Sequence, residues 1–193
     1  MNKNLENAIR IVKRGGVIIF PTDTTFVIGC RMDKKSSVER LFEIRRRSHE
    51  KAVLVLVDSI GMGQEYLKPI PKDVREQLME KYWPGGLTIV LRCIKEKIPT
   101  LVRGGGETLG IRMPSHNTIL KLIKRVGVPI LGPSANFSGQ KTPFLMSDLN
   151  PNLVRKVDFV LSGRCKIKQP STVLDVTKKP WRVIRAGAVK IYE

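Results

Sequence analysis

Small hydroxyl and amide side chains gather at four junctions of the sequence, in a pattern that could bind a polar ligand. The junctions are PTDTT at 21–25, PSHN at 114–117, PSANFSG at 133–139 and ST at 171–172. Each one alone is typical of a turn, because proline, serine, asparagine and aspartate are ordinary turn residues. Each also lies beside a strand-like apolar run, and loops at strand ends of α/β proteins converge on one crevice. The four junctions together therefore predict a shared site for a small polar molecule.

Four arginines add the chemistry of anion binding to these junctions. Arg45 extends the apolar stripe of a predicted helix toward the core, and Arg47 follows it. Arg112 lies within the apolar run LGIRM, and Arg185 repeats this arrangement in VIRAG. An unpaired buried charge is costly, so such arginines are paired or face a cavity, and guanidinium binds phosphate and carboxylate bidentately. We expect all four to line a crevice for a ligand with several anionic groups, although a cation at the position of Arg45 would also complement the helix dipole.

Other catalytic chemistries lack the residues that they need. No GxxxxGK[ST] sequence is present, so a Walker loop does not hold a nucleotide here. His49 and His116 have no motif partners for a Ser/His/Asp triad or a metal site. Acidic residues near the predicted site are few, chiefly Asp23 and Asp175. The sequence therefore favours catalysis by positioning and charge stabilisation, and it predicts no metal ligands.

Composition and charge limit the class of protein and its partners. With 193 residues and 41% hydrophobic residues, we expect one globular domain over 1–193. Thirty-five basic residues against 17 acidic ones give a net charge of +18, which attracts nucleotides, RNA or DNA. A basic proteome or a hot habitat would give the same excess. Charge alone therefore does not separate a small nucleotide from a tRNA.

The cysteines and the apolar runs predict a cytoplasmic protein. Cys30, Cys93 and Cys165 are far apart and form no CxxC pair, which favours a reducing compartment and three small buried side chains. No run approaches the roughly 18 apolar residues that a membrane span needs. The polar N-terminal segment is not typical of a signal peptide. We therefore expect no membrane partner.

The elements that must position these residues alternate between helix and strand. Helical periodicity is present at 5–12, 36–45, 74–82 and 119–126, and Ser36 with Glu39 has the spacing of a capping box. Strand-like runs occupy 17–20, 52–57, 87–93, 109–113, 129–132, 158–162, 172–176 and 181–186. Interleaved helices and strands indicate the α/β class. The strand-rich C-terminal third favours a mixed sheet over a regular parallel one.

Seven segments in order resemble the motifs of the YrdC-like family, in its short single-domain form. They are PTDTTFVIG, IRRRSHEKAV, WPGGLTIVL, LGIRMP, PSANFSG, STVLDV and VIRAGA, and they extend from about residue 17 to residue 188. The resemblance implies a YrdC-like fold, in which a twisted, mainly mixed β-sheet with flanking helices surrounds a concave basic crevice. It implies an L-threonylcarbamoyladenylate synthase, a nucleotidyltransferase that forms threonylcarbamoyl-AMP and pyrophosphate from L-threonine, bicarbonate or CO2, and ATP with Mg²⁺. A separate transferase complex would then modify adenosine 37 of tRNAs that read ANN codons.

The resemblance also implies a role for each matching residue. Arg45 and Arg47 match catalytic positions. Contacts to L-threonine are implied for Thr24, Arg112, Ser134 and Ser171. Contacts to the nucleotide are implied for Arg45, Arg47, Lys51, Thr108, Ser134, Asn136 and Arg185.

Three alternatives stay open at this point. Arg45 replaces the lysine usual in the family, and Val27 replaces a glycine, so a diverged paralogue with an altered substrate is one alternative. A second is a module that binds double-stranded RNA or tRNA without catalysis, through the net positive charge. A third is the carbamoyl-adenylate-forming domain of hydrogenase maturation, which the absence of zinc-finger and acylphosphatase-like segments disfavours.

Overall fold

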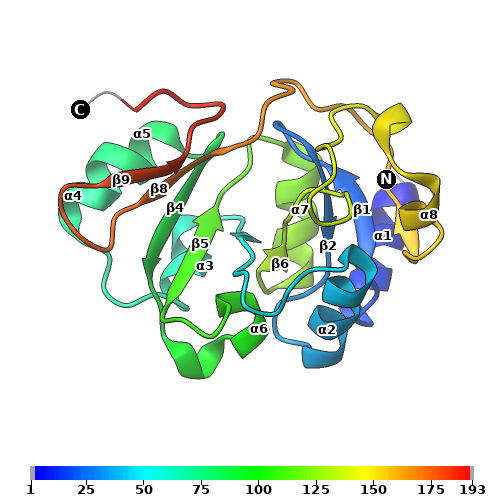
Figure 1. Cartoon of the computed structure of the whole chain (residues 1–193), viewed down its shortest axis with the longest axis horizontal. Helices are drawn as coiled ribbons and strands as arrows, with labels where there is room; N and C mark the ends of the chain where they lie inside the picture. Colours follow the sequence, from blue (N-terminus) through cyan, green and yellow to red (C-terminus); the bar gives the residue numbers. More distant parts are fainter. Residues whose placement is uncertain (1–2, 192–193) are drawn as a thin grey trace.

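Two sheets form the centre of the molecule, which is described here by a computed structural model over residues 3–191 (Figure 1). The smaller sheet has the strand order β2-β1-β7, with β2 (Phe26–Gly29), β1 (Ile18–Pro21) and β7 (Phe159–Val160). The larger has the order β6-β3-β5-β4-β8-β9, with β6 (Ile130–Leu131), β3 (Val55–Leu56), β5 (Thr108–Arg112), β4 (Leu87–Arg92), β8 (Thr172–Asp175) and β9 (Arg182–Arg185). Parallel pairs (β1–β7, β3–β5, β4–β8) alternate with antiparallel ones. The predicted α/β class with a mixed sheet is therefore confirmed.

Backbone contacts join the two sheets. Val27 and Ser134 form an isolated antiparallel bridge, and Ile28 N–H donates to the carbonyl of Pro133 at 2.9 Å. The N–H of Leu131 donates to the carbonyl of Cys30 at 2.9 Å. The segment that follows β6 is therefore held beside β2.

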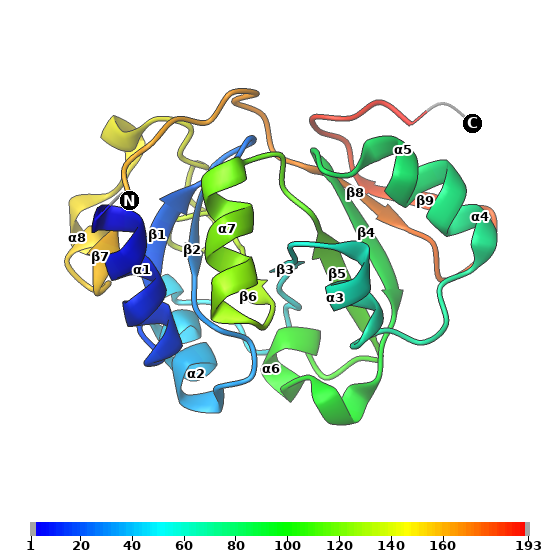
Figure 2. The ribbon, with the colours of Figure 1, turned by 180° about the vertical axis from the view of Figure 1, so that it is seen from behind.

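Helices cover the outer faces of both sheets (Figure 2). The helices α1 (Lys3–Lys13) and α7 (Asn117–Val126) pack side by side against the small sheet, whereas α2 (Lys35–Arg45) contributes to the larger core cluster. The large sheet is covered by α3 (Ile60–Gln64) and by a helix built from α4 (Lys72–Val74), a π-helical turn (Arg75–Met79) and α5 (Glu80–Tyr82). Shorter helical segments are α6 (Thr100–Arg103), α8 (Pro151–Val154), and 3₁₀ turns at Lys95–Lys97 and Met146–Asp148.

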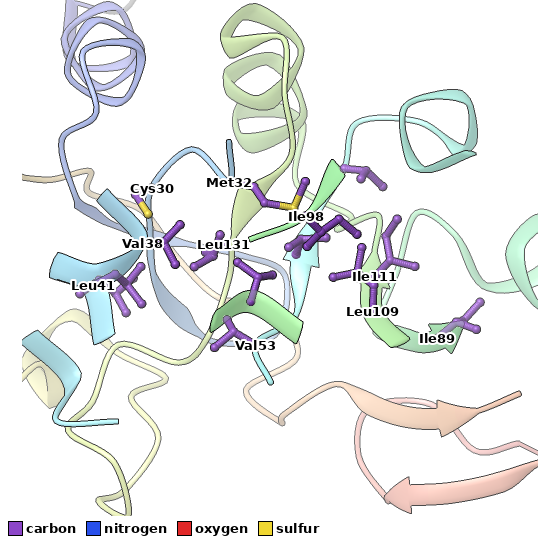
Figure 3. Packing of buried hydrophobic residues seen from close by; sticks show 14 of the residues in the cluster. Cys30, Met32, Val38, Leu41, Val53, Ile89, Ile98, Leu109, Ile111 and Leu131 are labelled. Carbon is purple, nitrogen blue, oxygen red and sulfur yellow. The ribbon is translucent and has the colours of Figure 1, made fainter. Parts of the chain in front are cut away.

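The hydrophobic core fixes the strands that carry the site. Ile89, Leu109 and Ile111 are almost fully buried in the same cluster as Leu41 and Leu131 (Figure 3). Burial of aliphatic side chains of this size stabilises a fold by about 1.5–3 kcal/mol each. The alternate residues of β4 and β5 face the other way, so one rigid face of the large sheet remains for function.

One expectation about the elements is wrong, and one strand was not predicted. The capping box of Ser36 is absent, because the helix begins at Lys35 and Lys34 occupies the N-cap without a side-chain bond. PTDTT is the turn of a hairpin whose second strand, β2, periodicity did not predict. The three cysteines are buried and unpaired, as predicted. No helix within residues 3–191 is long and apolar enough to cross a membrane.

Candidate functional site

A cavity of about 630 Å³, called the crevice below, opens between the two sheets. Pockets of 300–1,000 Å³ are typical of small-molecule and cofactor sites. Polar and charged side chains in its lining are Thr24, Thr25, Arg45, Arg47, Thr88, Thr108, Arg112, Ser134, Thr142, Ser171 and Arg185. They come from both sheets, from the end of α2 and from the segment after β6. The crevice therefore collects residues that are far apart in the sequence.

Strand alternation explains how β5 supplies three positions to the floor of the crevice. Thr108, Gly110 and Arg112 line the crevice, while Leu109 and Ile111 between them are buried in the core. Successive side chains of a strand point to opposite faces, so every second residue reaches the same face. The sequence TLGIR thus encodes one apolar face and one face for a ligand.

The charge of the crevice comes from arginine alone. Its lining contains four arginines, and none of its lining residues is an aspartate or glutamate. A concave surface with one sign of charge concentrates ligands of the opposite sign. The crevice is therefore suited to an anionic ligand.

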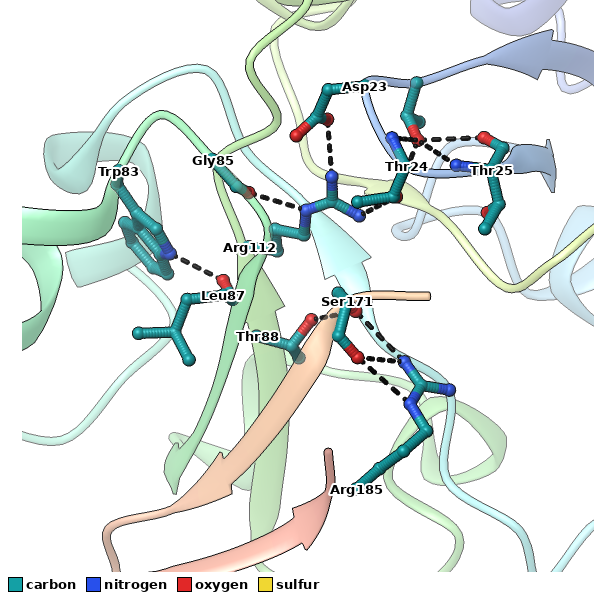
Figure 4. Close-up of polar contacts among 11 residues, drawn as sticks. Asp23, Thr24, Thr25, Trp83, Gly85, Leu87, Thr88, Arg112, Ser171 and Arg185 are labelled. Atoms are coloured by element: carbon teal, nitrogen blue, oxygen red, sulfur yellow. Dashed lines mark hydrogen bonds and ion pairs between the residues drawn. The ribbon is translucent and has the colours of Figure 1, made fainter. Parts of the chain in front are cut away.

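Arg112 is a buried cation whose charge is compensated. Its Nη2 forms an ion pair with Asp23, its Nη1 donates to Thr24 Oγ1 at 2.7 Å, and its Nε donates to the carbonyl of Gly85 at 2.8 Å (Figure 4). The side chains of Arg112 and Asp23 are 3% and 2% exposed. Burial lowers the pKa of Arg112, and the Asp23 carboxylate opposes that shift. The guanidinium is held in one orientation at the edge of the crevice.

The β1–β2 turn prepares the partners of Arg112. Thr22 Oγ1 accepts the N–H groups of Thr24 and Thr25, each at 3.2 Å, and donates to the carbonyl of Thr25 at 2.8 Å. Hydroxyl groups stabilise tight turns in this way. The turn therefore fixes Asp23 and Thr24 beside Arg112, and PTDTT is both a turn and part of the site.

Arg45 is also buried, but no carboxylate within residues 3–191 forms an ion pair with it. Its Nε donates to the main-chain carbonyl of Asn136 at 3.0 Å, and its Nη2 donates to Asn136 Oδ1 at 3.3 Å. Its Nη1 is buried and has no hydrogen-bond partner among the described residues. Burial, with the nearby positive charge of Arg47 as a smaller cause, lowers the pKa of Arg45 to about 10. Arg45 thus retains a positive charge at neutral pH, although burial destabilises the charged form of its side chain.

Arg47 and Arg185 complete the basic lining. Arg47 donates to the carbonyls of Lys51 and Ala52, at 3.0 and 2.5 Å. Arg185 donates to the carbonyl of Ser171 at 2.8 Å and to its Oγ at 3.0 Å, and that Oγ lies 2.9 Å from Thr88 Oγ1 (Figure 4). Arg185 is not buried as Arg112 is, because β9 is an edge strand and its residues are exposed. Arg185 therefore lies in a strand and lines the crevice, as predicted, but it is more exposed than Arg112.

The structure brings together most of the residues that the sequence predicted for the site. Thr24, Arg45, Arg47, Thr108, Arg112, Ser134, Ser171 and Arg185 line the crevice. Lys51 and Asn136 are not in its lining: Lys51 is exposed, and Asn136 is buried against Arg45. The structure adds Thr25, Thr88, Gly110 and Thr142. Strand alternation from Arg112 could have revealed Gly110, whereas no local signal marks Thr142.

The donor set of the crevice does not fit a resident metal ion. Within residues 3–191, no group of three histidine, cysteine, aspartate or glutamate side chains is placed to hold one. Mg²⁺ prefers carboxylates and phosphate oxygens, and the crevice lining supplies no carboxylate. A divalent ion would have to enter with a phosphate-bearing ligand.

Comparisons with known proteins found a protein-family model and relatives that match this chain. The Sua5/YciO/YrdC family model, described as "Telomere recombination", matches residues 10–187. A protein of Pyrococcus abyssi named threonylcarbamoyl-AMP synthase is 32% identical over 187 residues, which cover 96% of this chain and 54% of that protein. This chain therefore spans about half the length of that relative.

Two solved structures share the fold over 95% of this chain. The structure of P. abyssi Sua5 complexed with L-threonine has a TM-score of 0.87 at 31% identity, and covers 95% of this chain and 54% of that one. The structure of Escherichia coli YciO has a TM-score of 0.83 at 28% identity, and covers 95% of this chain and 88% of that one. The residues that the family model matches, 10–187, include the strands of both sheets and the residues that line the crevice.

Proposed function

We propose that this chain, which belongs to the Sua5/YciO/YrdC family, forms threonylcarbamoyl-AMP and pyrophosphate. Its substrates would be L-threonine, bicarbonate or CO2, and ATP. The observation that carries the proposal is the pair of buried arginines in one crevice. The charge of Arg112 is compensated by Asp23, whereas the charge of Arg45 is not compensated. Such a crevice suits one ligand of low net charge and one polyanion.

The compensated arginine is suited to an amino acid. An ion pair with Asp23 leaves Arg112 with little net charge, but its fixed guanidinium retains N–H groups that can bind a carboxylate. Thr24, Ser134 and Ser171 place hydroxyl groups in the same crevice. We assign the carboxylate of L-threonine to Arg112 and its polar groups to these hydroxyls.

The uncompensated arginines are suited to a triphosphate. Arg45 and Arg47 face one crevice without a lining carboxylate, and guanidinium groups aimed at developing negative charge stabilise it. Thr108 and Arg185 would add further nucleotide contacts. Mg²⁺ would enter as part of the MgATP substrate, because the crevice offers it no carboxylate.

The reaction needs positioning more than acid–base chemistry. The free amine of threonine forms a C–N bond with CO2 and releases a proton to solvent, or forms it with bicarbonate and releases water, and it becomes an N-carboxylate. An oxygen of that carboxylate attacks the α-phosphorus of ATP, the bond to the bridging oxygen breaks, and pyrophosphate leaves. Arg45, Arg47 and Arg185 would stabilise charge on the phosphates, so no carboxylate pair is required.

The wider role is part of the same proposal. We assign residues 1–193 to one catalytic domain that acts in the cytoplasm. A threonylcarbamoyl transferase complex would then transfer the threonylcarbamoyl group of its product to adenosine 37 of tRNAs that read ANN codons. The net charge of +18 supports a phosphate-bearing partner. Direct contact with tRNA or double-stranded RNA is the alternative use of that charge.

Pyrophosphate release by the purified chain tests the proposal. We expect release with ATP, Mg²⁺ and bicarbonate to depend on L-threonine, and a mass spectrum to show threonylcarbamoyl-AMP. Binding of ATP or threonine without release would instead indicate a diverged paralogue. If neither small molecule binds and RNA affinity falls steeply with salt, the chain is an RNA-binding module.

Gly110 gives a second test, because it leaves the floor of the crevice open. A Cβ at Gly110 would lie 3.6 Å from Leu54 Cβ and 3.6 Å from Thr88 Cγ2, which are ordinary contacts, so Gly110→Ala should fold normally. Gly110→Leu would extend into the space that the crevice lining encloses. We expect the leucine variant to lose about tenfold or more in ATP affinity at an unchanged melting temperature, and the alanine variant to lose about threefold at most. Equal ATP affinities for wild type and both variants would place the nucleotide elsewhere.

A further inference from the structure

Asn136 has no hydrogen-bond donor left for a phosphate group. Its two Nδ2 hydrogens are used, because Nδ2 donates to the carbonyl of Phe137 at 3.0 Å and to that of Gln140 at 2.7 Å. A side-chain amide offers only these two donors. Its Oδ1 accepts from Arg45, and an amide oxygen cannot donate to an anion. The side chain is 7% exposed and is not part of the crevice lining.

The segment around Asn136 holds the end of α2 at three points. Arg45 donates to the Asn136 carbonyl and to Asn136 Oδ1, and the N–H of Ser138 donates to the Arg45 carbonyl at 2.8 Å. Positions 45 and 136 are 91 residues apart in the sequence. Two hydrogen bonds from one guanidinium to one residue fix its plane. The orientation of Arg45 in the crevice wall therefore depends on Asn136.

The groups that hold Arg45 are neutral, and this separates it from Arg112. A carboxylate at the place of Oδ1 would give the same geometry but would cancel the charge, as Asp23 does for Arg112. A carbonyl and an amide oxygen fix the guanidinium without cancelling its charge. The lowered pKa of Arg45 agrees with a cation that no anion stabilises.

We infer that Asn136 is a positioning residue, which orients Arg45 through neutral acceptors and keeps its charge available to an anion in the crevice, and that Asn136 does not itself touch the nucleotide. The inference rests on the proposed role of Arg45 in binding phosphate. It replaces the nucleotide contact that the family resemblance implied for Asn136. Asn136→Asp should therefore weaken anion binding by neutralising Arg45, and not by repelling the anion directly.

A double-mutant cycle with inorganic pyrophosphate tests this inference. Asn136→Asp and Asn136→Ala both remove the donors to Phe137 and Gln140, and they differ in that aspartate keeps an acceptor for Arg45 and adds a negative charge. Each substitution is made in the wild-type chain and in an Arg45→Met background. Pyrophosphate affinity is measured by calorimetry at fixed ionic strength, and thermal unfolding is followed in parallel.

In the wild-type background we expect Asn136→Asp to bind pyrophosphate about tenfold more weakly than Asn136→Ala. In the Arg45→Met background that difference should fall below about threefold, because the group through which Asn136 acts is gone. A difference of the same size in both backgrounds would show that residue 136 contacts the anion directly, and would overturn the inference. Absence of pyrophosphate binding to wild type would also overturn it. If the cycle shows the expected coupling but threonine-dependent release is absent, the positioning role stands and the proposed synthase reaction fails.

Discussion

Arg112→Met is expected to abolish measurable L-threonine binding and, at the same time, to destabilise the fold. The Asp23 carboxylate is 2% exposed, and its second oxygen has no hydrogen-bond partner among the described residues. Removing the guanidinium leaves this carboxylate buried without a counter-charge, and breaking a buried ion pair from one side costs about 3–5 kcal/mol. Urea unfolding would measure the free energy of unfolding, and calorimetry would measure the threonine affinity.

The matched control is the double variant Asp23→Asn/Arg112→Met. It removes both charges, so most of the lost stability should return, because a neutral pair of this size costs little to bury. Threonine binding should remain absent in the double variant, since its carboxylate has lost the guanidinium. Wild-type threonine affinity in either variant would contradict the role assigned to Arg112. A double variant as unstable as the single one would show that the unpaired carboxylate is not the cause.

Arg45→Met is expected to have the opposite effect on stability. The side chain is 3% exposed, and its charge is held by neutral groups only. A pKa that burial lowers to about 10 means that the folded chain binds this proton more weakly than the unfolded chain does. Charged Arg45 therefore opposes folding at neutral pH, and its replacement should stabilise the fold by about 1–3 kcal/mol.

The pH dependence of this gain is a direct check. Below pH 10 the guanidinium is charged in both states, so the gain from methionine should be complete. It should diminish as the pH rises above about 10, because the folded wild type then loses the proton before the unfolded chain does. Urea unfolding at pH 7 and pH 10.5 would measure the free energy of unfolding of wild type and variant with Arg45 charged and with Arg45 partly neutral. The other titrating groups are the same in both proteins, so their contribution cancels in the difference. If Arg45→Met is less stable than wild type at pH 7, the claim that the charge of Arg45 is uncompensated is contradicted.

The same substitution should remove much of the nucleotide binding. Loss of a desolvated charged contact costs about 2–5 kcal/mol, so ATP affinity should fall by about thirtyfold or more. Arg45→Lys is the control, because it keeps the charge but loses the two bonds to Asn136. We expect the lysine variant to retain more ATP affinity than the methionine variant. Equal ATP affinities for wild type and Arg45→Met would exclude Arg45 from the nucleotide site.

Residue patterns and the order of the motifs were enough to predict the α/β class and the family. The run LGIRM predicted a strand whose Arg112 is paired or faces a cavity, and the structure shows both. The helix with Arg45 on its buried side was likewise readable from periodicity, and Arg45 is buried. Local patterns succeed here because side-chain direction follows from the period of the helix or strand. The β2 strand was missed because Phe26–Gly29 is a short apolar run directly after a turn, without alternation.

Only the tertiary structure decided what each arginine can do. In the sequence, Arg45, Arg112 and Arg185 are equivalent as cations near apolar runs. In the fold, Arg112 meets the carboxylate of Asp23, 89 residues away, Arg45 meets the neutral groups of Asn136, 91 residues away, and Arg185 lies exposed on an edge strand. The physical reason is that the compensation of a charge depends on ångström-scale distances to groups that are remote in the sequence, and on the water that burial removes. Residue type and spacing therefore predicted an anion site, while the contacts across the fold determined which of its charges remain free to bind.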